Sequence, residues 1–154
     1  MRIEILAVDR LRSDWARMAM AEYLERTRRF SGIDRREIKA ARGGDSRAVE
    51  EEGKRLLKAA ARGPRDQLVA LSPAGESIDS EGWAALFAEW MEHRVNRVVF
   101  AVGGVGGLSL VVLEEADRTL ALGPHTLSHE LAQIVLVEQI YRAWTIMAGE
   151  PYHK

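Results

Sequence analysis

The stretch that decides the fold reads Val98-Val99-Phe100-Ala101-Val102-Gly103-Gly104-Val105-Gly106-Gly107-Leu108-Ser109. Its first five residues are all apolar, which predicts a buried strand. The glycines that follow carry no Cβ, so the backbone there can adopt positive φ and approach a ligand closely. A buried strand that opens into a glycine loop therefore predicts a ligand crevice at the carboxyl end of a sheet.

A second turn-rich stretch follows a short helix and a short strand, and it reads Leu122-Gly123-Pro124-His125-Thr126-Leu127-Ser128. An amphipathic helix is expected directly after it, over 129–147, and Ser128 has a side chain suited to capping that helix. Because a helix N-terminus presents free N–H groups to a ligand, we expect this loop to line the same crevice as the glycine loop.

The rest of the chain alternates between strand and helix patterns. Strands are expected at 3–8, 33–39, 67–72, 97–102 and 119–122. Helices are expected at 14–29, from 45 or 46 to a stop at Gly63-Pro64, at 80–94, at 109–116 and at 129–147. This alternation predicts an α/β fold with a mostly parallel sheet and helices on both faces. No repeat, low-complexity tract or linker interrupts it, so a single domain over 1–154 is expected.

Local signals predict three of the boundaries. Asp14 and Ser80 are residue types that cap helices, and each precedes a helical pattern. Pro73-Ala74-Gly75-Glu76 predicts a turn, because proline and glycine both favour turns.

Composition narrows the class of protein. The chain has 154 residues, 47% hydrophobic residues, a formal net charge of −1 and no cysteine, which suits a soluble protein in a reducing cytoplasm. The absence of cysteine excludes disulfides, thiolate metal ligands and a cysteine nucleophile. The apolar start is broken by Glu4 and closed by Asp9, so no signal peptide is expected, and no apolar stretch has membrane-spanning length.

Charge is distributed unevenly along the chain. Residues 1–42 carry eleven Lys and Arg against seven Asp and Glu, whereas residues 98–154 carry three against six. A basic N-terminal face could bind phosphate. The other interpretation is a solvated surface of paired charges. The arginines concerned are Arg26, Arg28, Arg29, Arg35 and Arg36.

Several kinds of chemistry are disfavoured. No Ser-His arrangement of the nucleophile-elbow type appears. The dinucleotide fingerprint fails, because Ser109 stands where a third glycine would follow Gly104 and Gly106. His125 and His129 are four apart, but Pro124 indicates that His125 lies in the loop, and no third ligand stands at metal-site spacing, so no metal is expected.

Four blocks of the C-terminal third resemble one family. They are Gly103-Gly104 with Gly107-Leu108, Thr126-Leu127-x-His129, Glu138-Gln139-x-Tyr141-Arg142-Ala143-Trp144 and Pro151-Tyr152-His153-Lys154. On these residues the chain resembles the RlmH family of SPOUT-class methyltransferases, and the similarity extends over essentially the whole chain. That family methylates N3 of a pseudouridine in 23S ribosomal RNA. The resemblance also implies a C-terminal trefoil knot, which nothing in the residue pattern shows.

The resemblance implies where S-adenosylmethionine binds, largely through backbone groups. The corresponding residues are Leu71, Gly103, Gly104, Leu122, Gly123, Pro124, His125, Thr126 and Leu127. Three strand ends would thus meet at the cofactor. The plainer interpretation of the glycines is an ordinary strand-to-helix turn.

The resemblance places the substrate site at Glu138, Arg142, Tyr152 and His153. Without it, Glu138 and Arg142 would be an ordinary ion pair on a helix surface. The N3 proton would pass to Glu138, His153 or a water, and the sequence does not choose among them. Family members are homodimers, so the last helix is expected to pack on its twin and the C-terminal tail to complete the partner's site.

Three positions depart from the family pattern: Val105, usually Pro or Ser and here followed by an extra glycine; Ser128, usually Pro; and Gln133, usually Arg. The leading hypothesis is a cytoplasmic homodimeric S-adenosylmethionine-dependent methyltransferase that acts on ribosomal RNA, with the assembled ribosome as substrate. The alternatives are a SPOUT-like protein that binds RNA or the ribosome without catalysis, and an enzyme that uses another nucleotide cofactor.

Overall fold

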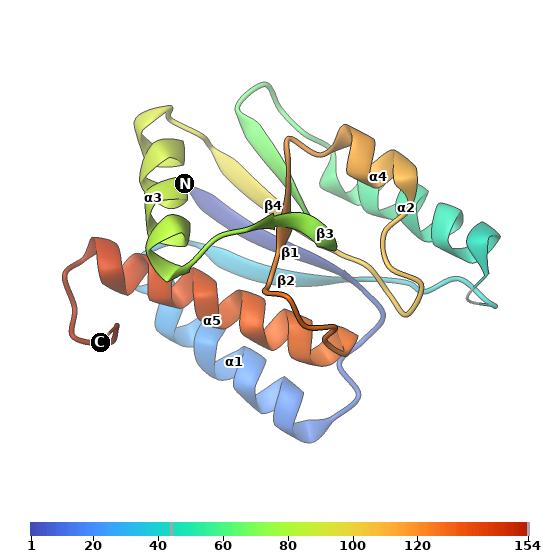
Figure 1. Ribbon diagram of the computed structural model, residues 1–154, viewed down its shortest axis with the longest axis horizontal. Coiled ribbons are helices and arrows are strands. Elements are labelled where there is room, and N and C mark those ends of the chain that lie inside the picture. The colour runs from blue at the N-terminus through green and yellow to red at the C-terminus, as the bar shows by residue number, and fades with distance from the viewer. Residues whose placement is uncertain (44, 154) are drawn as a thin grey trace.

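A parallel five-stranded sheet forms the centre of the computed structural model, which describes residues 1–43 and 45–153 (Figure 1). The strand order is β2-β1-β4-β3-β5. All paired strands are parallel. The strands are β1 (Arg2–Val8), β2 (Ile33–Ile38), β3 (Asp66–Ser77), β4 (Arg97–Val102) and β5 (Arg118–Ala121).

Helices cover both faces of this sheet, as Figure 1 shows. The helices are α1 (Asp14–Arg28), α2 (Ser46–Ala60), α3 (Ser80–Glu92), α4 (Leu110–Glu115) and α5 (His129–Met147). On one face α5 packs between α1 and α3, and on the other α2 packs against α4. The predicted α/β class is confirmed. No helix among the described residues is long and apolar enough to cross a membrane.

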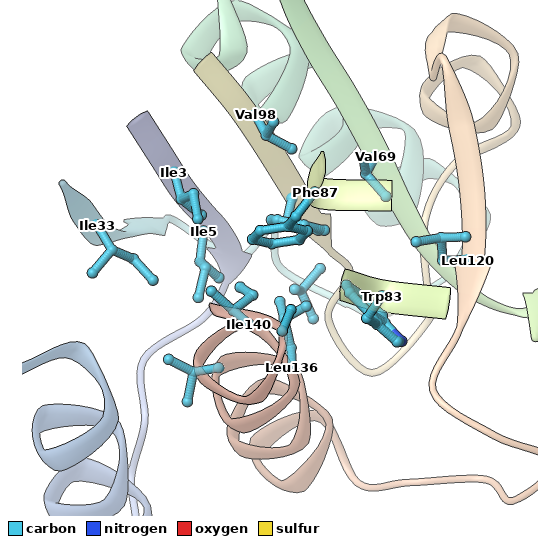
Figure 2. Close-up of a cluster of buried hydrophobic side chains, with 14 of the residues drawn as sticks. Ile3, Ile5, Ile33, Val69, Trp83, Phe87, Val98, Leu120, Leu136 and Ile140 are labelled. Atoms are coloured by element: carbon cyan, nitrogen blue, oxygen red, sulfur yellow. The ribbon is translucent and has the colours of Figure 1, made fainter. Parts of the chain in front are cut away.

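Alternating side chains of the central strands build two cores. On β1, Ile3 and Ile5 face α5, whereas Leu6 and Val8 face α2, since successive side chains of a strand point to opposite faces. Burial on both faces explains why β1 from Ile5 to Val8 and β4 from Val98 to Val102 are apolar. Figure 2 shows the larger core, in which Ile140 of α5 and other side chains of α3 and α5 meet the sheet.

The predicted turn at 73–76 is wrong, because these residues lie inside β3. The second half of β3 pairs with β5, with Glu76 opposite Leu120, after a register shift that begins at Leu71. A Cβ on Gly75 would lie only 2.6 Å from the carbonyl carbon of Leu120. Glycine is therefore required here by the close approach of two strands and not by a turn.

Two predicted helix caps are displaced by one residue. The N-cap of α3 is Asp79, whose carboxylate accepts a hydrogen bond from the N–H of Gly82 at 2.8 Å. The N-cap of α1 is Ser13. The bounds predicted for α5 are confirmed, and Ser128 caps it by accepting from the N–H of Leu131.

Candidate functional site

A pocket of about 450 Å³ opens where three segments meet at the carboxyl end of the sheet. The segments are Leu71–Pro73 in β3, the glycine loop after β4, and the loop that joins β5 to α5. Ligand pockets in proteins typically measure about 300–1,000 Å³. Residues of these three segments line one cavity, which we call the first pocket, although Leu71 lies within β3 and not at its end.

Most of the residues predicted to bind a cofactor line the first pocket. They are Leu71, Gly103, Gly104, Leu122, Gly123, His125, Thr126 and Leu127. Pro124 is not in the wall, although both of its neighbours are. The sequence reasoning missed Val102, Ser128, His129 and Ala132, which also line it. Val102 and Ser128 adjoin predicted residues and His129 lies in one of the family blocks, whereas no such signal marks Ala132.

The glycine loop is folded tightly on itself. The N–H of Gly107 donates to the carbonyl of Gly104 at 3.0 Å, and Gly107 has a φ of +79°. A Cβ on Gly103 would overlap the carbonyl group of Gly107 and lie 2.8 Å from the nitrogen of Leu108. Gly103 and Gly107 are thus positions where a larger residue would disturb the backbone of the pocket wall.

The wall of the first pocket is apolar and backbone-rich. Leu71, Leu122 and Leu127 are among its apolar side chains. Among the described lining residues there is no carboxylate, ammonium or guanidinium group. Such a wall suits a flat ring that is held by dispersion and recognised by main-chain N–H and C=O groups.

A second group of predicted residues gathers at the other end of α5. Arg142 Nη2 donates to Glu138 Oε1 at 2.6 Å, and the phenol of Tyr152 donates to the same oxygen at 3.0 Å. The C-terminal tail is thereby folded back on α5, with the guanidinium of Arg142 4.7 Å from the centre of the Tyr152 ring. His153 Nδ1 lies 3.3 Å from Arg142 Nη1.

Electrostatic coupling inside this C-terminal cluster of Glu138, Arg142, Tyr152 and His153 is strong. The hydrogen bond from Arg142 to Glu138 raises the pKa of the guanidinium. Burial, followed by the hydrogen bond with Tyr23 and the charge of Glu138, raises the pKa of the Tyr152 phenol. The phenol is therefore a hydrogen-bond donor at neutral pH. With side chains 17% and 24% exposed, Glu138 and Arg142 are more enclosed than an ordinary surface ion pair.

The first pocket and the C-terminal cluster are separated within one chain. His129 lines the pocket and Arg142 belongs to the cluster. From one to the other, α5 rises by about 20 Å at roughly 1.5 Å per residue. The structure therefore brings the predicted residues together in two sets and does not join the two sets.

The last helix is expected to pack on its twin, but several of its apolar side chains are already buried within the chain. Val137, Tyr141 and Trp144 are buried, and α5 packs against both α1 and α3. Leu131, which is 40% exposed, and the half-buried Val135 lie on the open face. A second chain would have to cover this open face instead.

The basic N-terminal residues are bound to partners in the same chain. Arg26 pairs with Glu22, Arg28 with Glu25, Arg29 with Glu150 and Arg36 with Glu4. Arg35 donates through Nε to the buried amide of Gln133 at 2.8 Å and through Nη2 to the carbonyl of Asp9. The arrangement matches the interpretation as a surface of paired charges.

Across the part of the chain that the structure describes, no three His, Asp or Glu side chains come together as a ligand set for a metal. His125 and His129 both line the first pocket. They lie there without a carboxylate beside them in its wall.

Comparison with known proteins adds an independent finding. The family model described as "Predicted SPOUT methyltransferase" matches residues 1–153. The chain is 42% identical to ribosomal RNA large subunit methyltransferase H of Anaeromyxobacter sp. (strain Fw109-5), over 100% of both chains. It is 42% identical to the protein of that name from Solidesulfovibrio magneticus, over 98% of this chain and 97% of the relative. For the Streptococcus agalactiae serotype III protein the identity is 35% over 100% of both.

Proposed function

Because the chain belongs to the SPOUT methyltransferase family, we propose that it transfers a methyl group from S-adenosylmethionine to N3 of a pseudouridine in 23S ribosomal RNA. Relatives that are similar over their whole length are named as ribosomal RNA large subunit methyltransferases. The observation that carries the proposal is the first pocket, whose wall includes most of the residues that the family resemblance selects. The proposal takes residues 1–154 as one domain that acts in the cytoplasm on the assembled ribosome.

The first pocket fits the donor. Leu71, Leu122 and Leu127 provide the apolar wall that an adenine ring requires, and the missing Cβ of Gly103 leaves room for close backbone approach. When bound, S-adenosylmethionine supplies a methyl group already activated by a sulfonium. The protein therefore has to hold donor and acceptor in line and keep water out.

The C-terminal cluster supplies the acceptor side of the proposal. Arg142 and Tyr152 present a cation and an aromatic ring, groups that bind phosphate and stack on bases. Loss of the N3 proton accompanies attack on the methyl group. Glu138, His153 and a water remain the three candidate acceptors, because the imidazole and the carboxylate are both within this hydrogen-bonded cluster.

A homodimer would unite the two sets of residues. Their separation of about 20 Å along α5 prevents one chain from using both at the same reaction centre. If two α5 helices pack antiparallel across a two-fold axis, the N-terminal end of each lies beside the C-terminal end of the other. Leu131 and Val135 on the open face would then be covered, and the tail of one protomer would reach the first pocket of its partner.

Three measurements test the proposal. Calorimetry should detect binding of S-adenosylmethionine, sedimentation should give the mass of a dimer, and ribosomes that carry the unmethylated pseudouridine should acquire labelled methyl. An absence of both binding heat and methyl incorporation would contradict the proposal. Co-sedimentation with ribosomes without methyl transfer would favour the alternative of a non-catalytic RNA-binding protein.

A further inference from the structure

A second pocket lies on the other side of the glycine loop, with a volume of about 260 Å³. It shares Gly104, Val105 and His129 with the first pocket, so the loop is a wall between the two. The side chains that line it are more polar than those of the first pocket. They include Asp9, Arg12 and Glu52.

Glu52 is the unusual group in this pocket. Its side chain belongs to a residue only 7% exposed, and Oε1 accepts a hydrogen bond from the N–H of Ala41 at 2.9 Å. Within residues 1–43 and 45–153, Oε2 has no hydrogen-bond donor and no cation as a partner. Oε2 faces the glycine loop, 3.4 Å from the place that a Cβ of Gly104 would occupy. A carboxylate oxygen in the wall of a pocket can accept a hydrogen bond from an N–H group of a ligand.

His129 carries an unsatisfied buried atom in the shared wall. Its Nε2 is buried and, among the described residues, has no hydrogen-bond partner. Buried polar atoms are rarely left without partners in native proteins. One such atom in the wall of a small polar hollow indicates that a polar ligand completes the site.

We propose that the second pocket binds a uracil-type nucleobase of the RNA substrate, with Glu52 Oε2 accepting its ring N–H; this rests on the proposed function. One free carboxylate oxygen matches one ring N–H. Guanine would present two adjacent donors, but Oε1 is already occupied by Ala41. Cytosine and adenine carry no ring N–H on their pairing edge. Arg12 and His129 also line this pocket, and their side chains would donate hydrogen bonds to a carbonyl oxygen of the base.

Size and position agree with this assignment. The hollow is smaller than the first pocket, and we assign to it only the base of a nucleotide. The side chain of Val105 is 97% exposed at the rim of both pockets and offers an apolar surface to a base. A nucleobase held on one side of the glycine loop would fix the register of the RNA strand relative to the donor on the other side.

The test uses mononucleotides, because they share the phosphate and ribose and differ only in the base. Uridine 5′-monophosphate is expected to shift the amide NMR signals of Ala41, Gly104 and Gly106, and to bind about tenfold more tightly than cytidine 5′-monophosphate. In Glu52→Gln, the amide oxygen can keep the bond to Ala41 while the NH₂ group faces the base. Because cytosine N3 is an acceptor, this variant should prefer the cytidine nucleotide.

Glu50→Gln is the matched control, since Glu50 is an exposed carboxylate on the same helix, and it should retain the wild-type preference. Equal binding of both nucleotides by wild type, or an unchanged preference in Glu52→Gln, would overturn the inference. Calorimetry with S-adenosylmethionine on the same samples separates this failure from a failure of the proposed function. Should Glu52→Gln unfold, Glu52→Asp withdraws the carboxylate from the base and should weaken uridine binding alone; unchanged binding would count against the inference.

Discussion

The two ends of α5 differ in the kind of chemical groups that form the site beside them. Around His129, the first pocket is formed by strand ends and glycines, and its shape depends on backbone conformation. Around Arg142, the C-terminal cluster is formed by long polar side chains that hydrogen-bond to one another. The first end should therefore tolerate changes of exposed side chains but no added Cβ at Gly103, whereas the second should be sensitive to the identity of each side chain.

The largest effect is expected from adding one methyl group at the backbone-built end. In Gly103→Ala the new Cβ would overlap the carbonyl of Gly107, so the loop must open and the wall of the first pocket must move. We expect S-adenosylmethionine affinity to fall by more than about 100-fold, a loss of roughly 3 kcal/mol. Calorimetry measures this directly.

Gly63→Ala is the control for that substitution. A Cβ on Gly63 would meet nothing closer than 3.7 Å, and its φ lies outside the left-handed range. It should leave cofactor binding unchanged. Tight binding by Gly103→Ala would show that the loop is not the rigid wall that its geometry indicates.

The next effect concerns the end that is built from side chains. Arg142→Ala removes the cation that pairs with Glu138 and covers the ring of Tyr152, but it leaves the first pocket intact. We expect methyl transfer to fall by about 100-fold through lost positioning, while S-adenosylmethionine affinity changes less than twofold. Single-turnover methylation together with calorimetry separates the two quantities, and Arg142→Lys should recover only part of the rate because it lacks the planar fork.

Mixing the two variants tests whether the ends belong to one reaction centre. In a heterodimer of Gly103→Ala and Arg142→Ala, one composite site would carry both defects and the other neither. An isolated heterodimer should regain about half of the wild-type activity, and an equal mixture after random subunit exchange about a quarter, if two-fold symmetric protomers share their sites. No recovery, with subunit exchange verified, would mean that each chain completes its own site.

At the N-terminal end of α5, the polar cap at Ser128 and the helical period act locally, so the sequence alone predicted the bounds of α5. The residues expected around the cofactor came from the family resemblance and make up only part of the wall of the first pocket. The second half of β3 was missed because its pairing with β5 is a contact between distant residues. Proline and glycine at 73–75 have the same local preferences in a turn and in this irregular strand.

Other features depend on how charges pair in space. Counting residues indicated a basic N-terminal face, but it could not show that Arg29 would meet Glu150 or that Arg35 would meet Gln133. Gln133 is fully buried, so its difference from the family's arginine lies in the interior. The resemblance named the residues of both ends of α5, and only the structure gave the distance between them. The predicted trefoil knot stays a prediction.

The contribution of the N-terminal end of α5 to the stability of the fold should depend on pH. Glu130 accepts hydrogen bonds from the hydroxyl and N–H of Ser13 and the N–H of Arg12, which lower the pKa of its carboxyl group to about 2. A carboxyl whose pKa is lower in the folded state stabilises the fold above its unfolded pKa of about 4.3. That stabilisation is lost as the pH falls toward 2.

Glu130→Gln removes the charge that titrates. Thermal unfolding should show a lower Tm than wild type at pH 7, and the difference should shrink between pH 4.5 and pH 2 as the wild-type carboxyl is protonated. Glu114→Gln, an exposed carboxyl on α4 without a hydrogen-bond partner among the described residues, should show no such pH dependence. A constant difference across this range would mean that the bonds to Ser13 do not depend on the charge.

The smallest effect is expected at the tip of the glycine loop. Val105 stands between Gly104 and Gly106 and is 97% exposed, so its side chain adds almost nothing to the packing of the wall. Val105→Ser should change the free energy of unfolding by less than about 0.5 kcal/mol and S-adenosylmethionine affinity by less than twofold. Chemical denaturation and calorimetry measure both. A large loss of cofactor affinity in this variant would mean that side-chain identity also matters in the wall of the first pocket. The two ends of α5 would then not differ in their sensitivity to side-chain changes.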